Sequence, residues 1–209
     1  MTVMNQLAHA QGRRDEVPNQ ELAKELAETR NETGIQEIID GLKSKDQKVQ
    51  NDCIKVAYEI GYLAPELISV YAHEFLDLLR SRNNRLVWGG MIALASIAEI
   101  KADDLYEERD KLIKAIDQGS VITQDNGIRV LARVASQKRE YRVELFPYLL
   151  AHLETCRPKD VAQRSEQIVK AVDANNKQQF IAVIEKRMAH LSPSQVKRLE
   201  KVIKEAEKR

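Results

Sequence analysis

The chain has 209 residues and a net charge of +1, with 31% charged and only 5% aromatic residues, 8 glycines and 5 prolines. A chain of this length can bury one sizeable core or a continuous run of small stacked units, and the composition is typical of a soluble, mostly helical protein. No apolar run approaches the length of a membrane span, and polar residues interrupt residues 1–16, which therefore lack the apolar core of a signal peptide. We therefore expect a cytoplasmic protein with no membrane segment.

The N-terminal residues differ from the rest of the chain in having no helical periodicity. Residues 1–18 are expected to form a flexible N-terminal arm that ends at Pro18. A short helix should follow, with Asn19 as its cap and Gly34 as its end. We assign residues 19–209 to a single domain.

From Ile35 onward, apolar residues recur with a period of 37 residues, as from Ile38 to Phe75, Leu112 and Leu149. Each of these residues is followed by apolar residues at the next position and at the fourth position. This spacing places three side chains on one stripe of a helix, so it predicts the first helix of a repeated helix pair.

A second apolar pattern follows the first at the same period and predicts the second helix of each pair. At one position of this pattern every copy has a small residue: Cys53, Gly90, Gly127 and Ser165. Glycine inside a helix costs about 1 kcal/mol relative to alanine, so small residues at a fixed position indicate close approach to a neighbouring helix. A fifth, shorter pair closes the chain, with Ser192 as the cap of its second helix.

Three stretches resemble HEAT repeats, an armadillo-like helical family: DQKVQND at residues 46–52, LFPYLLAHL at residues 145–153, and RPKDVAQRSEQIVKAV at residues 157–172. The resemblance covers about residues 35–208. It implies an all-α fold, a right-handed α-solenoid of about five stacked helix pairs whose second helices line a concave face. It also implies a role as a scaffold or adaptor.

Positions of the second helices that lie off the apolar stripe should face the concave side. These candidate partner-binding residues are Asn51, Lys55, Trp88, Asp125, Asn126, Arg129, Arg133 and Arg164. Trp88, the only tryptophan, is either an anchor for a partner or a packing residue between repeats.

The other candidates also have two interpretations. Asp125 and Asn126 either bind a ligand by hydrogen bonds, or Asp125 interacts favourably with the dipole of its own helix and binds backbone amides of the next repeat. The three arginines either contact phosphates or carboxylates, or form salt bridges between repeats.

No pattern indicates catalysis, a cofactor or a metal ion. None of the four histidines has a cysteine or a carboxylate at the sequence spacing of metal ligands. Cys53 and Cys156 are expected to be reduced, structural thiols.

The sequence therefore predicts a non-enzymatic scaffold that binds a protein partner, or a second copy of itself, through its concave face. The alternative is a nucleic-acid-binding protein, since Trp88, Asp125, Arg129 and Arg164 are similar in kind to the groove residues of HEAT-like alkylpurine DNA glycosylases. Such an aspartate could stabilise positive charge on a sugar. The chain departs from that family because Trp88 and Asp125 lie a whole repeat apart.

The charge distribution also bears on this alternative. Residues 1–119 carry 15 lysines and arginines against 21 aspartates and glutamates, whereas residues 120–209 carry 18 against 11. An acidic N-terminal half would repel DNA.

Overall fold

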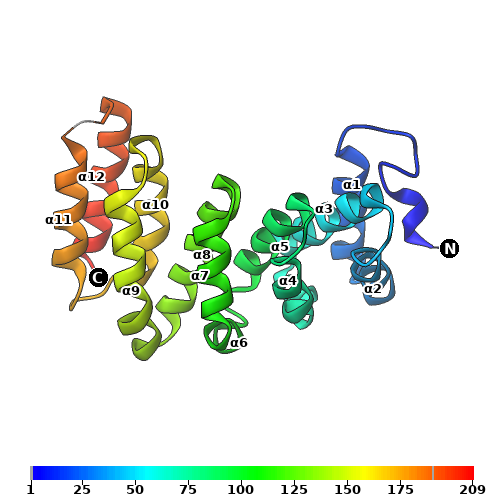
Figure 1. Cartoon of the computed structure of the whole chain (residues 1–209), viewed down its shortest axis with the longest axis horizontal. Helices are drawn as coiled ribbons and strands as arrows, with labels where there is room; N and C mark the ends of the chain where they lie inside the picture. Colours follow the sequence, from blue (N-terminus) through cyan, green and yellow to red (C-terminus); the bar gives the residue numbers. More distant parts are fainter. Residues whose placement is uncertain (1, 190) are drawn as a thin grey trace. The chain divides into compact units, whose positions relative to one another are not determined.

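The computed structural model describes residues 2–189 and 191–209, and these residues form helices connected by short loops (Figure 1). The chain divides into two compact units, residues 1–127 and 128–209. The α-helices are α1 (Val17–Thr29), α2 (Glu32–Gly41), α3 (Gln47–Leu63), α4 (Ala72–Leu78), α5 (Asn84–Ile97), α6 (Ala102–Glu107), α7 (Arg109–Gln118), α8 (Val121–Gln137), α9 (Arg139–Thr155), α10 (Val161–Ile168), α11 (Lys177–Met188) and α12 (Pro193–Glu207).

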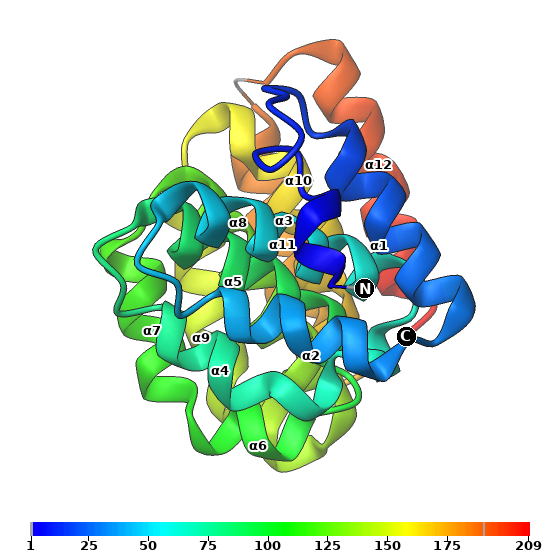
Figure 2. The same cartoon turned by 90° about the vertical axis from the view of Figure 1, so that its right-hand side faces the viewer.

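Within the first unit, α3 packs between α1 and α5, while α2 packs on α3 and α4 packs on α5. Within the second unit, α9 packs on α10, α11 packs on α12, and α10 also contacts α12. Figure 2 shows the first unit end on, with α2 and α4 beside the layer that contains α3 and α5. The predicted helix pairs are therefore confirmed, and the second helix of one pair packs on the second helix of the next.

Polar side chains set the starts of several helices. The side chains of Asn31, Asp46 and Asn83 cap α2, α3 and α5 by accepting hydrogen bonds from backbone N–H groups of the first turn. Each cap satisfies one of the donors that a helix start leaves without a partner. Ser192 is the cap of α12 with Pro193 at the first helical position, as the sequence predicted.

The small residues of the second helices lie where helices approach each other closely. A Cβ atom on Gly127 would lie 2.2 Å from Cγ1 of Ile116, and one on Gly90 would lie 3.1 Å from the backbone oxygen of Phe75. Cys53 and Ser165 are fully buried. The expected close approach is confirmed, and it explains why glycine occurs inside two helices.

The structure differs from the prediction at both ends of the first helix. Asn19 does not cap α1, which begins at Val17; it lies within the helix and is fully buried. The helix ends at Thr29, and Arg30, its C-terminal cap, has a left-handed backbone with a φ of 48°. Gly34 lies inside α2 because Asn31 starts a new helix three residues earlier.

Residues 2–16, called here the N-terminal segment, pack on the first unit. They contain a short 3-10 helix, η1 (Val3–Gln6), which contacts α1 and α2. Val3, Leu7 and Ala8 are buried. The sequence led us to expect a flexible arm over residues 1–18; the described part of it differs because three apolar side chains leave water by packing on the helices.

No helix of the described residues combines the length and the apolar character that a membrane span requires.

Candidate functional site

The second helices α3 and α5 of the first unit carry a face of charged and aromatic side chains, called here the α3–α5 face. Its members are Lys55, Tyr58, Glu59 and Tyr62 of α3, Arg85 and Trp88 of α5, and Glu16 at the end of the N-terminal segment. The spacing of three and four residues along each helix places its members on one side of that helix.

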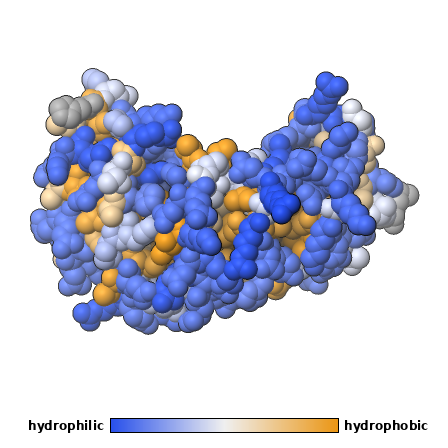
Figure 3. Space-filling view, viewed as in Figure 1, coloured by the Kyte–Doolittle hydropathy of each residue, from blue (hydrophilic) through white to orange (hydrophobic). Residues whose placement is uncertain are grey.

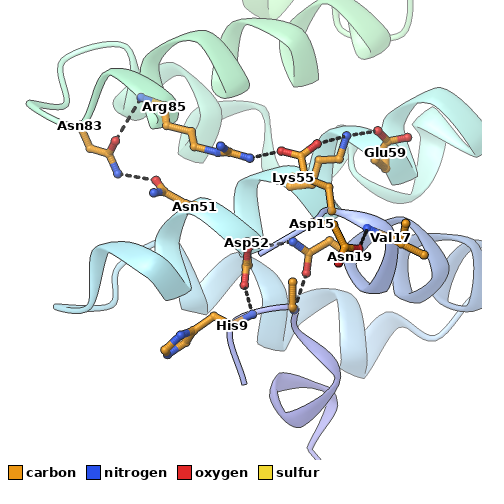
Figure 4. Close-up of polar contacts among 12 residues, drawn as sticks. His9, Asp15, Val17, Asn19, Asn51, Asp52, Lys55, Glu59, Asn83 and Arg85 are labelled. Carbon is orange, nitrogen blue, oxygen red and sulfur yellow. Dashed lines mark hydrogen bonds and ion pairs between the residues drawn. The ribbon is translucent and has the colours of Figure 1, made fainter. Parts of the chain in front are cut away.

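Four of these residues form a chain of ion pairs (Figure 4). Nζ of Lys55 lies 2.6 Å from Oε1 of Glu59 and 3.0 Å from Oε2 of Glu16. The other oxygen of Glu16 accepts a hydrogen bond from the guanidinium of Arg85. The N-terminal segment, α3 and α5 are thus held together by one carboxylate that contacts two cations.

The surroundings shift the pKa values of this network in opposite directions. Burial would raise the pKa of the Glu16 carboxyl, but the hydrogen bonds from Lys55 and Arg85 outweigh it and hold that pKa below its usual value. Burial likewise opposes the charge of Lys55, but hydrogen bonds to Glu59 and Glu16 raise the net pKa of its amine. Both groups are therefore charged at neutral pH, and the charges of the four residues balance.

An aromatic row lies beside the ion pairs. The ring centroid of Tyr58 is 6.0 Å from that of Tyr62 and 6.1 Å from that of Trp88. Lys55 lies over the Tyr58 ring at 4.9 Å and Arg85 over the Trp88 ring at 5.4 Å, both within the range of cation–π attraction.

The ends of the aromatic row differ from its centre in exposure. Tyr62 is 54% exposed and Trp88 is half-buried, whereas Tyr58 between them is buried. Burial raises the pKa of the Tyr58 hydroxyl. The surface visible in Figure 3 is mostly hydrophilic, with apolar side chains in smaller patches. The α3–α5 face thus presents one exposed aromatic ring, Tyr62, and one half-buried ring, Trp88.

Amide side chains connect α3 and α5 at their N-terminal ends. Nδ2 of Asn83 donates to Oδ1 of Asn51 at 2.9 Å, and Oδ1 of Asn83 accepts from the backbone N–H of Arg85 at 3.0 Å. These contacts fix the half-buried Asn51 beside the α3–α5 face.

A pocket opens next to this point, between the N-terminal segment and the first turns of α3 and α5. It has a volume of about 360 Å³ and is called here the N-terminal pocket. Its charged lining residues are Arg13, Arg14, Asp15, Glu16, Lys48, Asp52 and Arg85. Asp52 accepts hydrogen bonds from the backbone N–H of His9 at 2.7 Å and from Nδ2 of Asn19 at 2.8 Å.

Three of the predicted partner-binding residues lie together on α3 and α5: Asn51, Lys55 and Trp88. Of these, Lys55 is only 5% exposed, so it presents little of its surface to a partner. The predicted pair Asp125 and Asn126 lies in the first turns of α8 and is half-buried. Nδ2 of Asn126 donates to the backbone oxygen of Ile122 within the same helix.

The three predicted arginines belong to the second unit. Arg129 and Arg133 of α8 are half-buried, whereas Arg164 of α10 is only 3% exposed. One terminal nitrogen of Arg164 lies 2.9 Å from Nδ1 of His152. Their role in binding stays a prediction.

Five residues of the α3–α5 face were not among the sequence candidates: Tyr58, Glu59, Tyr62, Arg85 and Glu16. Tyr58 and Tyr62 follow Lys55 by three and seven residues, and Arg85 precedes Trp88 by three, so helical spacing could have identified them. Glu16 precedes the first helix and carries no periodic signal. Only its packing shows that it belongs to this face.

The described residues contain no cluster of three or more histidine, cysteine or carboxylate side chains that could hold a metal ion. Cys53 and Cys156 are free and buried.

Neither a protein-family model nor a curated protein matches this chain. Solved structures do match. An engineered protein matches 100% of this chain and 98% of its own, with a TM-score of 0.69 and 16% identity. A designed armadillo repeat protein in complex with the peptide (KR)4 matches 89% of this chain and 86% of its own, with a TM-score of 0.69 and 17% identity.

Kap121p bound to Pho4p matches 88% of this chain over 21% of its own length, with a TM-score of 0.63 and 17% identity. At such identities the likeness establishes the fold alone. The chain has an all-α, armadillo-like α-solenoid fold with helices stacked in sequential pairs, which confirms the predicted fold class.

Proposed function

Because the chain has an armadillo-like α-solenoid fold with an exposed tyrosine and a half-buried tryptophan on two adjacent second helices, we propose that it binds an extended segment of a partner protein on the α3–α5 face, without catalysis. The observation that carries this proposal is the aromatic row, in which Tyr62 and Trp88 remain accessible on either side of the buried Tyr58. Tyrosine and tryptophan bury much area at a low entropic cost, and they are enriched among the residues that dominate binding energy.

The ion pairs support the aromatic row as a binding surface. Glu16, Lys55 and Arg85 hold the N-terminal segment, α3 and α5 in a fixed arrangement. A preorganised surface loses less entropy when a partner binds. Peptide or protein complexes are also found among structures of the same fold, such as the designed armadillo repeat protein with (KR)4 and Kap121p with Pho4p.

The same ion pairs argue against nucleic-acid binding on this face. Binding to a phosphate backbone requires cations that can replace its counterions. Lys55 and Arg85 are each engaged by a carboxylate, so this network offers no net positive charge. We therefore favour the protein-binding hypothesis over the glycosylase-like alternative.

The proposal can be tested with a random peptide display library selected on the immobilised full chain. Selected peptides should bind the Tyr62→Ala and Trp88→Ala double variant more weakly by on the order of tenfold or more, because each substitution removes an aromatic contact. Tyr71→Ala is a matched control, since Tyr71 bonds Gln36 rather than a residue of the α3–α5 face. Circular dichroism should show equal helicity for all three proteins.

Equal affinity of the selected peptides for the wild type and the double variant would contradict the proposal. Salt-sensitive quenching of Trp88 emission by duplex DNA would instead favour the nucleic-acid alternative. A molar mass of two chains in light scattering, lost in the double variant, would identify a second copy of the chain as the partner.

A further inference from the structure

The N-terminal pocket contains more positive charge than its own carboxylates neutralise. Arg13 forms a two-point contact with Asp15, with Nε and Nη2 at 3.0 and 2.9 Å from the two carboxylate oxygens. Arg85 pairs with Glu16. The side chains of Arg14 and Lys48, which also line the pocket, make no hydrogen bond or ion pair with another described residue.

The third acid of the pocket, Asp52, keeps its negative charge, so the four cations and three carboxylates of the lining leave a net charge of +1. Asp52 already accepts hydrogen bonds from His9 and Asn19. These bonds fix its position between the N-terminal segment and α1. The pocket therefore combines two unpaired cations with a carboxylate held in place by neutral donors.

Arg85 also lines the pocket, and its guanidinium already pairs with Glu16. Its Nε is enclosed and has no hydrogen-bond partner among the described residues. A buried donor without a partner costs about 1–3 kcal/mol, so an acceptor that reached it would be favoured. Guanidinium groups suit phosphate oxygens because they present several donors in one plane.

We propose that the N-terminal pocket binds the phosphate group of a small phosphomonoester. The oxygens of a phosphomonoester dianion can pair with both Arg14 and Lys48, whereas a carboxylate carries only one negative charge. The volume of about 360 Å³ lies at the lower end of the range of ligand pockets, about 300–1,000 Å³, and leaves room for an organic group beyond the phosphate. Hydroxyl or amino groups of that part can donate to Asp52.

This inference goes beyond the proposed function, since it requires no partner protein. Fluorescence of Trp88 can also report binding in the N-terminal pocket. Trp88 is the only tryptophan, and Arg85 of the pocket lies over its ring at 5.4 Å. A phosphate that interacts with the guanidinium of Arg85 should change the fluorescence emission of Trp88.

The test is a titration of the full chain with O-phosphoserine at constant ionic strength, followed by Trp88 emission and by calorimetry. O-phosphoserine should bind saturably and serine should not. The Arg14→Gln and Lys48→Gln double variant should bind on the order of tenfold more weakly, because two charge-assisted contacts are lost. Lys45→Gln is the matched control, since Lys45 is also exposed and precedes α3 but does not line the pocket.

Two further ligands identify the source of the phosphate. A peptide that contains phosphoserine and binds more tightly than the free amino acid would indicate a phosphorylated segment of a partner, and equal affinity would indicate a small metabolite. Acetate should bind more weakly than inorganic phosphate. No binding by calorimetry up to on the order of 10 mM, or binding that the double variant retains in full, would overturn the proposal.

The failure of this inference can be distinguished from that of the proposed function. Neither Tyr62 nor Trp88 lines the pocket, so the Tyr62→Ala and Trp88→Ala double variant should keep its calorimetric affinity for O-phosphoserine. The Arg14→Gln and Lys48→Gln variant should, conversely, still bind unphosphorylated peptides selected on the α3–α5 face.

Discussion

Asn19 of α1 and Asp52 of α3 are joined by a hydrogen bond of 2.8 Å from the amide Nδ2 of Asn19 to Oδ1 of the carboxylate. The amide oxygen of Asn19 accepts the backbone N–H of Ala8 at 2.9 Å, and the other oxygen of Asp52 accepts that of His9 at 2.7 Å. Two side chains on neighbouring helices thus satisfy two consecutive backbone donors of the N-terminal segment (Figure 4). The buried amide is one of the points at which this segment is attached.

Asn19→Ala should therefore destabilise the first unit. The substitution leaves the buried N–H of Ala8 without an acceptor and removes a donor from Asp52, which together cost about 1–3 kcal/mol. Chemical denaturation should show this loss, and hydrogen exchange at Ala8 and His9 should become faster. Gln20→Ala is the control, because Gln20 is the exposed neighbour on the same helix. Unchanged exchange at Ala8 would show that the amide does not hold the segment.

Glu16→Gln should remove a contribution to stability that depends on pH. The pKa of Glu16 is lowered in the folded chain, so its carboxylate stabilises the fold above the unfolded pKa of about 4.3. That contribution is lost as the pH falls through the lower, folded pKa. Because the side chain is 41% exposed, we expect only about 1 kcal/mol at pH 7.

The measurement for Glu16 is urea denaturation of wild type and variant at pH 7 and again near pH 3. The difference in free energy of unfolding should shrink at the lower pH. Glu21→Gln removes the same charge from an exposed position of α1 and should show no such pH dependence. A difference that stayed constant with pH would mean that Glu16 acts by packing rather than by charge.

Gly127→Ala should destabilise the chain although alanine favours helices. The new Cβ would lie 2.2 Å from Cγ1 of Ile116, and overpacking of this kind costs about 1–3 kcal/mol against a gain of about 1 kcal/mol in helix propensity. Ile116→Ala in the same chain would remove the clashing atom. A double-mutant cycle by thermal denaturation should therefore give effects that are less than additive. Additive effects would argue against the close approach of α7 and α8.

Both thiols should resist modification until the chain unfolds. Burial, aided by the charge of Asp52, raises the pKa of Cys53 to about 12, and burial also raises the pKa of Cys156. At pH 8 the thiolate fraction of Cys53 is then only about 1 in 10,000. A thiol reagent should label neither residue in native buffer and both in denaturant. Rapid native labelling, read by mass spectrometry, would locate a region that opens.

Helical periodicity made the repeats predictable. The recurrence of apolar residues placed the paired helices. The position where every repeat has a small residue identified where these helices approach each other closely; its members are Cys53, Gly90, Gly127 and Ser165. The same period placed Asn51, Lys55 and Trp88 on adjacent second helices, where the structure has them. These features follow from local geometry, because a regular helix turns sequence spacing directly into a face.

Only the tertiary structure decided how the N-terminal segment is used. Its residues carry no period, and the contacts that order it join Ala8 to Asn19, His9 to Asp52, and Glu16 to Lys55 and Arg85. These partners lie up to 69 residues apart in the sequence. The sequence by itself determined the helices and their faces, since neighbours along the chain fix them; the α3–α5 face and its pocket were completed by packing, since their contacts exist only in the folded chain.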